Sequence, residues 1–265
     1  SSDLFLWLPT DSGCGFWQGL NQFLRFEISD NNIIVQDLPN ILVIMTDQQR
    51  ATASHLYGNS FCQTPEMARL ANSGVLFENA ITPHPLCVPA RVSFWTSQFP
   101  RSHGVRGNET LMPEGAVHAF QIWKQAGYKT GLIGKNHCFE THRDLELLDV
   151  YCEIGHRGLP PKQPNKGMEW VRPIRSINTA HSVRQNMPNQ NPRFSYAISD
   201  FPLTDYGSGL IASQAVQFLE DSRDQAFALW VSFPDPHTPY EAPRKYVEMC
   251  PPNEVDLPPS TSNEF

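Results

Sequence analysis

The chain has 265 residues, of which 40% are hydrophobic and 18% are charged. This composition excludes an intrinsically disordered chain and supplies enough apolar side chains for a sizeable core. The formal net charge of −7 excludes the basic surface with which proteins bind nucleic acid. We therefore expect any anionic ligand to be held by a local cluster of positive side chains, against the overall field of the protein.

The first 38 residues form an N-terminal extension of unassigned role, in which two short strands are predicted around the turn-forming segment 29–32. From residue 39 onward, strand and helix patterns alternate. Continuous apolar runs typical of buried parallel strands occur at 41–45, 129–133 and 227–233. Helices bounded by capping residues, Pro or Gly are predicted at 65–72, 117–125 and 208–220.

This alternation predicts an α/β fold with a largely parallel sheet. Polar side chains follow each of the three predicted strands: Asp47 and Gln48 the first, Lys135 and His137 the second, and His237 the third. Ligands collect at the carboxyl ends of the strands in open α/β sheets, so we expect these side chains to meet at one edge. The segment 155–200 lacks apolar periodicity and is interpreted as a long loop or insertion over one face.

The spacing of the cysteines and of the apolar residues bears on three further classes: zinc-binding, membrane-spanning and secreted proteins. The six cysteines are scattered without a Cys-x-x-Cys pair, which argues against a zinc ribbon. No apolar run approaches the roughly 18 residues of a membrane helix, and the first residues lack the basic segment of a signal peptide. The sequence therefore predicts neither a membrane span nor a signal peptide, and it leaves the compartment and the oligomeric state open.

Cys87 is the candidate nucleophile. Pro89 suits the first turn of a helix, so Cys87 would lie just before a helix N-terminus, where the partial positive charge favours anions. Arg91 follows one turn later and can point to the same place, which makes a plausible oxyanion pocket. From spacing alone, the alternative that Cys87 is a small buried hydrophobic residue stays open.

The segment Cys87-Val88-Pro89-Ala90-Arg91 matches the Cys-x-Pro-x-Arg signature of the sulfatase family. Three other stretches resemble family motifs in the same order: PNILVIMTDQQR its first strand and metal-binding loop, AGYKTGLIGKNH its Gly-Lys-x-His segment, and FALWVSFPDPHTPYEAP its Pro-His-x-Pro segment. The resemblance covers about residues 39–255 and looks greatest to the branch with phosphonate monoester hydrolases and arylsulfatases. It implies an alkaline-phosphatase-like fold, a mostly parallel sheet flanked by helices, with 39–265 as the N-terminal part of the catalytic domain.

The resemblance also implies a chemistry. Cys87 would be oxidised to formylglycine by a formylglycine-generating enzyme, and the aldehyde hydrate would attack a small anionic ester. The attack would displace the ester alcohol, and the resulting sulfated or phosphorylated hemiacetal would then expel the inorganic anion and restore the aldehyde. Asp47, Gln48 and the modified Cys87 would bind a divalent metal, for which Ca²⁺ is the first choice and Mg²⁺ or Mn²⁺ are alternatives. Many sulfatases have a second Asp where this chain has Gln48.

By the same resemblance, Arg91 would hold the modified residue and the substrate oxygens. Lys135 would bind the substrate anion, and His137 would assist proton transfers on the hydrated side chain. His237 would serve as general acid or as a ligand of the leaving group. Asn108, a looser match, would bind substrate. The other histidines and cysteines are expected to be structural residues.

Family members complete the metal site with a later Asp-His or Asp-Asn pair, and the sequence shows no counterpart. We therefore expect an incomplete catalytic domain with weak metal binding and a sheet edge open to association. The preferred function is sulfate ester hydrolysis. The alternatives are phosphonate or phosphate ester hydrolysis on the same site, and an inactive sulfatase-like binding module.

Overall fold

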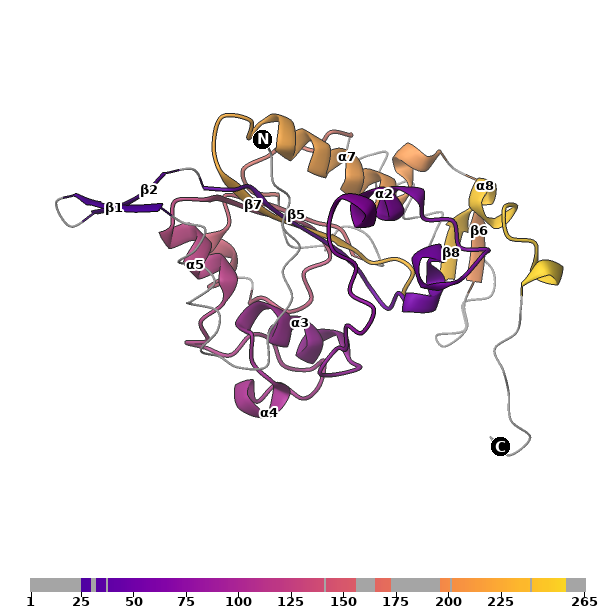
Figure 1. Cartoon of the computed structure of the whole chain (residues 1–265), viewed down its shortest axis with the longest axis horizontal. Coiled ribbons are helices and arrows are strands. Elements are labelled where there is room, and N and C mark those ends of the chain that lie inside the picture. Colours follow the sequence, from indigo (N-terminus) through magenta and orange to yellow (C-terminus); the bar gives the residue numbers. More distant parts are fainter. Residues whose placement is uncertain are drawn as a thin grey trace.

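The computed structural model describes residues 25–29, 32–36, 38–140, 142–155, 165–172, 196–200, 202–238 and 240–255. Most of the segment 155–200 lies outside these residues, so its interpretation as an insertion stays a prediction. Figure 1 shows a central sheet with α7 on one face and α3 and α5 on the other. None of the helices in the described part of the chain is long and apolar enough to cross a membrane.

The central sheet has four parallel strands in the order β3 (Ile41–Thr46), β7 (Phe227–Phe233), β4 (Lys129–Gly134) and β5 (Val150–Glu153). The three predicted strands and the parallel arrangement are confirmed. The strand β7 lies between β3 and β4, so the polar residues that follow these three strands share one sheet edge. The strand β3 forms the outer edge of the described sheet, where Ile44 is 53% exposed.

Helix α7 (Gly207–Glu220) covers one face of the sheet. Its apolar residues recur at helical spacing, and Ile211, Ala215 and Phe218 pack against Leu229 and Ile133 of the sheet. The helix begins one residue before the prediction. Burial of each large side chain in this layer contributes about 1.5–3 kcal/mol, which fixes the helix on the sheet.

The opposite face is covered by α3 (Cys87–Thr96) and α5 (Ala119–Gln125). An aromatic cluster joins them to the sheet: the Trp95 ring lies 4.8 Å from Trp230 and 5.0 Å from Phe120. Helix α5 starts two residues later than predicted because His118 serves as its N-cap, with a reciprocal bond to Gln121. The cluster holds α3 so that its N-terminus reaches the carboxyl ends of the strands.

The remaining elements are short. The predicted N-terminal strands are confirmed as the antiparallel pair β1 (Arg25–Ser29) and β2 (Asn32–Gln36), and the predicted first helix as α2 (Pro65–Ser73). Besides β5, the elements that were not predicted are α4 (Pro100–His103), α8 (Arg244–Val247), and the parallel pair β6 (Tyr196–Ser199) and β8 (Tyr240–Pro243). Single turns of 3-10 helix occur at Ala51–Ala53, His55–Tyr57, Leu145–Leu147, Leu203–Asp205 and Pro252–Glu254.

Candidate active site

Asp47 lies at the centre of the candidate site. It follows β3 directly, is 6% exposed, and donates its backbone N–H to the Asp235 carbonyl at 3.2 Å. Its Oδ2 atom forms an ion pair with the Lys135 ammonium and accepts a 3.3 Å hydrogen bond from Arg91 Nη2. Its Oδ1 atom accepts from Cys87 Sγ at 3.4 Å. The carboxylate therefore joins the end of β3 to two other segments, α3 and the loop after β4.

Cys87 is the first residue of α3, one position further into the helix than expected. Its thiol is partly exposed, and Sγ lies 3.9 Å from Lys135 Nζ. Asn108 Oδ1 accepts the Val88 N–H at 3.1 Å, so this predicted substrate-binding residue caps the first turn of α3. The thiol is thus held at a capped helix N-terminus among charged groups.

Arg91 is buried, and its described contacts go to protein atoms. Nη1 donates to the Lys135 carbonyl at 3.1 Å and to Ser232 Oγ at 2.9 Å, and the guanidinium lies over the Trp230 ring. These bonds join α3 to the ends of β4 and β7. Arg91 therefore fixes the framework around Asp47, and contact with substrate oxygens stays a prediction.

Ser232 is a buried residue of this network that sequence reasoning missed. Its hydroxyl accepts from Arg91, and its carbonyl accepts the Lys135 N–H at 2.8 Å. The one available signal was the polar side chain inside the apolar run FALWVSF. A hydroxyl at a fully buried strand position needs a partner, and here that partner is Arg91.

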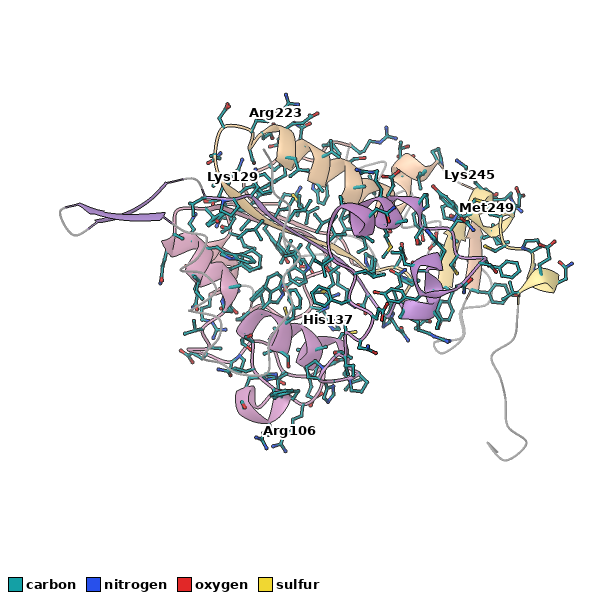
Figure 2. All side chains as sticks on the ribbon, viewed as in Figure 1. Arg106, Lys129, His137, Arg223, Lys245 and Met249 are labelled. Atoms are coloured by element: carbon teal, nitrogen blue, oxygen red, sulfur yellow. The ribbon has the colours of Figure 1, made fainter. Side chains whose placement is uncertain are left out.

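The two predicted histidines lie on loops after β4 and β7. Burial, followed by the charges of Lys135 and Arg91, lowers the pKa of His137 to about 4, so its imidazole is neutral at pH 7. Figure 2 shows His137 among packed side chains near α3. His237 Nδ1 lies 2.5 Å from the Thr238 carbonyl, which can only accept, so Nδ1 carries the hydrogen of this bond and Nε2 faces other partners.

Gln48 adopts a left-handed backbone conformation with φ of 63°, and its side chain is exposed. The structure gives it no assigned partner, so metal binding by Gln48 stays a prediction. The site as a whole is locally positive, because Lys135 and Arg91 face the single carboxylate of Asp47. Burial alone would raise the pKa of Asp47, but the two cations outweigh burial and lower it, which keeps the carboxylate ionised.

One group of possible metal donors occurs in the described ranges. Single ligand atoms of Asp47, Cys87 and His237 all lie within 4.8 Å of one another. A hard cation such as Ca²⁺ takes six to eight oxygen ligands, and a thiol is a soft ligand. The set therefore fits a hard cation only in part, and the fit improves when oxygen replaces the sulfur of Cys87.

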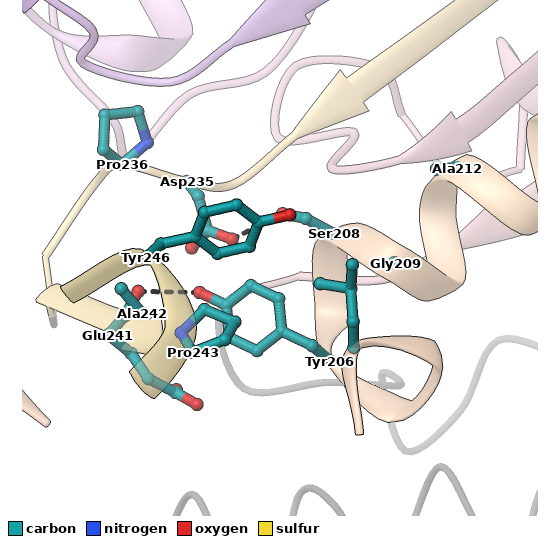
Figure 3. Close-up of a pocket in the computed structure, with 11 residues that line it drawn as sticks. Tyr206, Ser208, Gly209, Ala212, Asp235, Pro236, Glu241, Ala242, Pro243 and Tyr246 are labelled. Carbon is teal, nitrogen blue, oxygen red and sulfur yellow. Dashed lines mark hydrogen bonds between the residues drawn. The ribbon is translucent and has the colours of Figure 1, made fainter. Parts of the chain in front are cut away.

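A separate pocket of about 450 Å³ borders the His237 loop (Figure 3). Ser208 Oγ donates to Asp235 Oδ2 at 2.5 Å, and the Tyr206 hydroxyl donates to the Glu241 carbonyl at 2.7 Å. Tyr246 lines the same pocket. Because the lining is mainly apolar and includes the Asp235 carboxylate, this pocket is unsuited to an anionic group.

The family model for the sulfatases matches residues 39–253. This chain belongs to the sulfatase family. Among curated relatives, an ulvan-active sulfatase of Formosa agariphila is 31% identical over 235 residues, covering 86% of this sulfatase chain and 41% of the relative. An arylsulfatase of Clostridium perfringens is 28% identical over 236 residues, covering 83% of this chain and 47% of the relative.

The fold of this sulfatase chain is similar to that of the phosphonate monoester hydrolase of Agrobacterium radiobacter, with a TM-score of 0.58 and 20% identity. The match covers 80% of this chain and 44% of that one. The predicted alkaline-phosphatase-like fold is thereby confirmed. The sulfatase chain spans less than half the length of these relatives, so the activity of a whole protein is treated below as a proposal.

Proposed function

We propose that this chain supplies the nucleophile and the anion-binding side chains of a hydrolase that cleaves sulfate esters, with Cys87 converted to formylglycine by a formylglycine-generating enzyme. The observation that carries the proposal is the meeting of Cys87, Asp47 and Lys135 at one sheet edge, within hydrogen-bond or ion-pair reach of one another. Each of these residues lies in a different one of the segments that resemble the family motifs.

Each of four side chains has a separate role in the proposed reaction. Lys135 Nζ, 3.9 Å from Cys87 Sγ, is placed to bind the oxygens of an anion held at that side chain. We expect His137, neutral because of burial and the nearby cations, to accept a proton during attack. His237 is the candidate donor to the leaving oxygen. Arg91 keeps Asp47 and the ends of β4 and β7 in register.

Asp47 and the modified Cys87 would hold a divalent metal, with Gln48 as a further ligand proposed from the sequence, and a ring nitrogen of His237 lies within 4.8 Å of both donor atoms. When bound, the metal would neutralise developing negative charge and lower the pKa of the attacking hydroxyl. Ca²⁺ suits the carboxylate oxygen best, with Mg²⁺ or Mn²⁺ as alternatives.

A second candidate is a phosphonate or phosphate ester hydrolase on the same site. The fold likeness to a phosphonate monoester hydrolase favours it, as does Gln48 in place of a second Asp, which removes one negative charge near the anion. A third candidate is an inactive binding module, favoured by the small donor set.

The test combines mass spectrometry with hydrolysis. The chain is co-expressed with a formylglycine-generating enzyme, and the peptide containing Cys87 is analysed, with Cys87→Ala as the control. The protein is then assayed with an aryl sulfate and a phosphonate monoester. An aldehyde at position 87 together with faster aryl sulfate turnover supports the proposal. An aldehyde with faster phosphonate turnover supports the second candidate. An unmodified thiol without turnover supports the inactive module.

A further inference from the structure

The loop after β4 holds His137 in an unusual backbone conformation. Its φ of 58° lies in the left-handed region, which is sterically unfavourable for a residue with a Cβ atom. Such a conformation persists only where surrounding contacts determine it. We therefore expect contacts within the loop that hold the backbone of His137 in this conformation.

The side chain of Asn136 makes these contacts. It is buried, and its Oδ1 atom accepts the backbone N–H groups of Cys138 at 3.3 Å and of Phe139 at 2.9 Å. Its Nδ2 group donates to the Phe139 carbonyl at 3.1 Å. All three bonds return to the backbone just beyond His137, so the amide spans the left-handed residue and closes the loop.

The loop is also anchored from outside. Arg91 Nη1 donates to the Asn136 carbonyl at 3.4 Å, and the Met112 N–H donates to the Cys138 carbonyl at 2.8 Å. A side-chain hydrogen bond further links Asn136 to Tyr151 of β5. The carbonyls of Asn136 and Cys138, on either side of His137, are therefore both hydrogen-bonded to other segments. We expect the position of the His137 imidazole to depend on the Asn136 side chain, which bridges the backbone between them.

We propose that Asn136 is a positioning residue, which holds the His137 imidazole within the electrostatic field of Lys135, Arg91 and Asp47 by bridging the backbone from residue 136 to residue 139. The inference rests on the proposed function, in which His137 accepts a proton. Asn136 itself does not contact the substrate. Its effect on the reaction passes through His137, which gives the proposal a readout separate from overall stability.

Asn59 offers a matched control away from the site. Its Oδ1 atom accepts the N–H groups of Phe61 at 2.9 Å and Cys62 at 3.0 Å, and its Nδ2 group donates to the Thr52 carbonyl at 2.7 Å. Asn59→Ala and Asn136→Ala thus each remove an amide side chain that accepts two backbone N–H groups and donates to a backbone carbonyl, and Asn136→Ala also removes the bond to Tyr151. Only the loop bridged by Asn136 contains His137.

The first measurement needs no turnover. The NMR signal of the His137 imidazole and the exchange rates of the Cys138 and Phe139 amides are compared between wild type, Asn136→Ala and Asn59→Ala. We expect a changed His137 signal and amide exchange at least tenfold faster in Asn136→Ala alone. An unchanged His137 signal in that variant overturns the proposal, whether or not the protein hydrolyses esters.

The second measurement uses the converted protein and a double-mutant cycle. We expect Asn136→Ala to lower kcat about 10-fold to 100-fold with KM within about twofold, because a small misplacement of a reacting group has an effect of this size. In a His137→Ala background, Asn136→Ala should lower kcat no further. Equal losses in both backgrounds contradict positioning through His137. Should Asn136→Ala fail to fold, Asn136→Asp, which keeps the Oδ1 acceptor, carries the same comparison with a smaller expected loss.

Discussion

Arg91 Nη1 donates a 2.9 Å hydrogen bond to Ser232 Oγ, although 141 positions separate the two residues in the chain. Both side chains are buried, and the guanidinium also bonds to the carbonyl of Lys135 and to Asp47. A single side chain of α3 therefore holds the ends of three strands at a fixed spacing. The site depends on this spacing, because its polar residues lie on the loops that follow these three strands.

Replacing Arg91 with Lys tests this relationship. Lysine keeps the charge and loses the planar fork, so it cannot bond to Ser232, the Lys135 carbonyl and Asp47 at once. We expect the free energy of unfolding in urea to fall by about 2 kcal/mol, since buried acceptors lose their donors. Arg69→Lys, in an exposed pair with Glu66, should change it by less than about 0.5 kcal/mol. Equal effects in the two variants would contradict the interpretation.

Replacing Asp47 with Asn leaves the Lys135 and Arg91 cations buried without their counter-charge. Breaking a buried pair from one side costs about 3–5 kcal/mol, so we expect a loss of that order in the free energy of unfolding. Ca²⁺ should raise the thermal midpoint of wild type and have no effect on Asp47→Asn. The partly exposed pair of Asp205 with Arg172 provides the control: Asp205→Asn should cost less than about 1 kcal/mol and keep the response to Ca²⁺.

Asp144 makes the stability depend on pH. Burial opposes ionisation of this carboxyl, but bonds from the Arg143 guanidinium and the Glu140 N–H outweigh burial and lower its pKa. A lowered pKa in the folded state stabilises the protein above the unfolded pKa of about 3.9, and this stabilisation is lost as pH falls toward the folded value. We expect the urea midpoint of wild type to fall below about pH 5.

The variant Asp144→Asn should be less stable than wild type at pH 7 and show a shallower fall in acid. Asp200→Asn is the control, because the exposed pair of Asp200 with Arg244 is screened by solvent. Its acid profile should follow that of wild type. An Asp144→Asn profile as steep as wild type would assign the acid loss to other carboxyls.

Gly134 ends β4 with φ of 102°, and a Cβ atom there would lie 2.0 Å from the Ser232 carbonyl oxygen. Gly58 has a similar φ of 91° and nothing within 4 Å of the same position. We expect Gly58→Ala to cost only the left-handed strain, about 1 kcal/mol, and Gly134→Ala about 3 kcal/mol or more. Thermal or urea unfolding of both variants checks the difference, and equal costs would show that the backbone at Gly134 relaxes freely.

The strands that position the site could be predicted because fully buried parallel strands are continuous apolar runs. Their ends pointed to Asp47, Lys135 and His237, which the structure places at one sheet edge. The strand β5 was missed because its four residues gain their conformation from pairing with β4, and no local pattern marks them.

The contacts within the site were less predictable. The motif match led us to expect that Arg91 binds substrate, which stays a prediction, and it gave no sign that Arg91 also bonds to Ser232, Asp47 and backbone carbonyls. A motif gives a residue's place in a family pattern and says nothing about which of its donors the fold already uses. Asn136 was passed over for the same reason, since its bonds depend on a left-handed turn that the residue types do not encode.

The order of strands in the sheet also constrains how the protein is made. The strand β7 is synthesised after β3 and β4 and yet lies between them, so the two earlier strands meet no common neighbour until residue 233 has left the ribosome. Until then, apolar runs of the nascent chain stay open to chaperones and to wrong pairing. His237 emerges four residues after β7, so the side chains of the described site come together only once β7 has been synthesised.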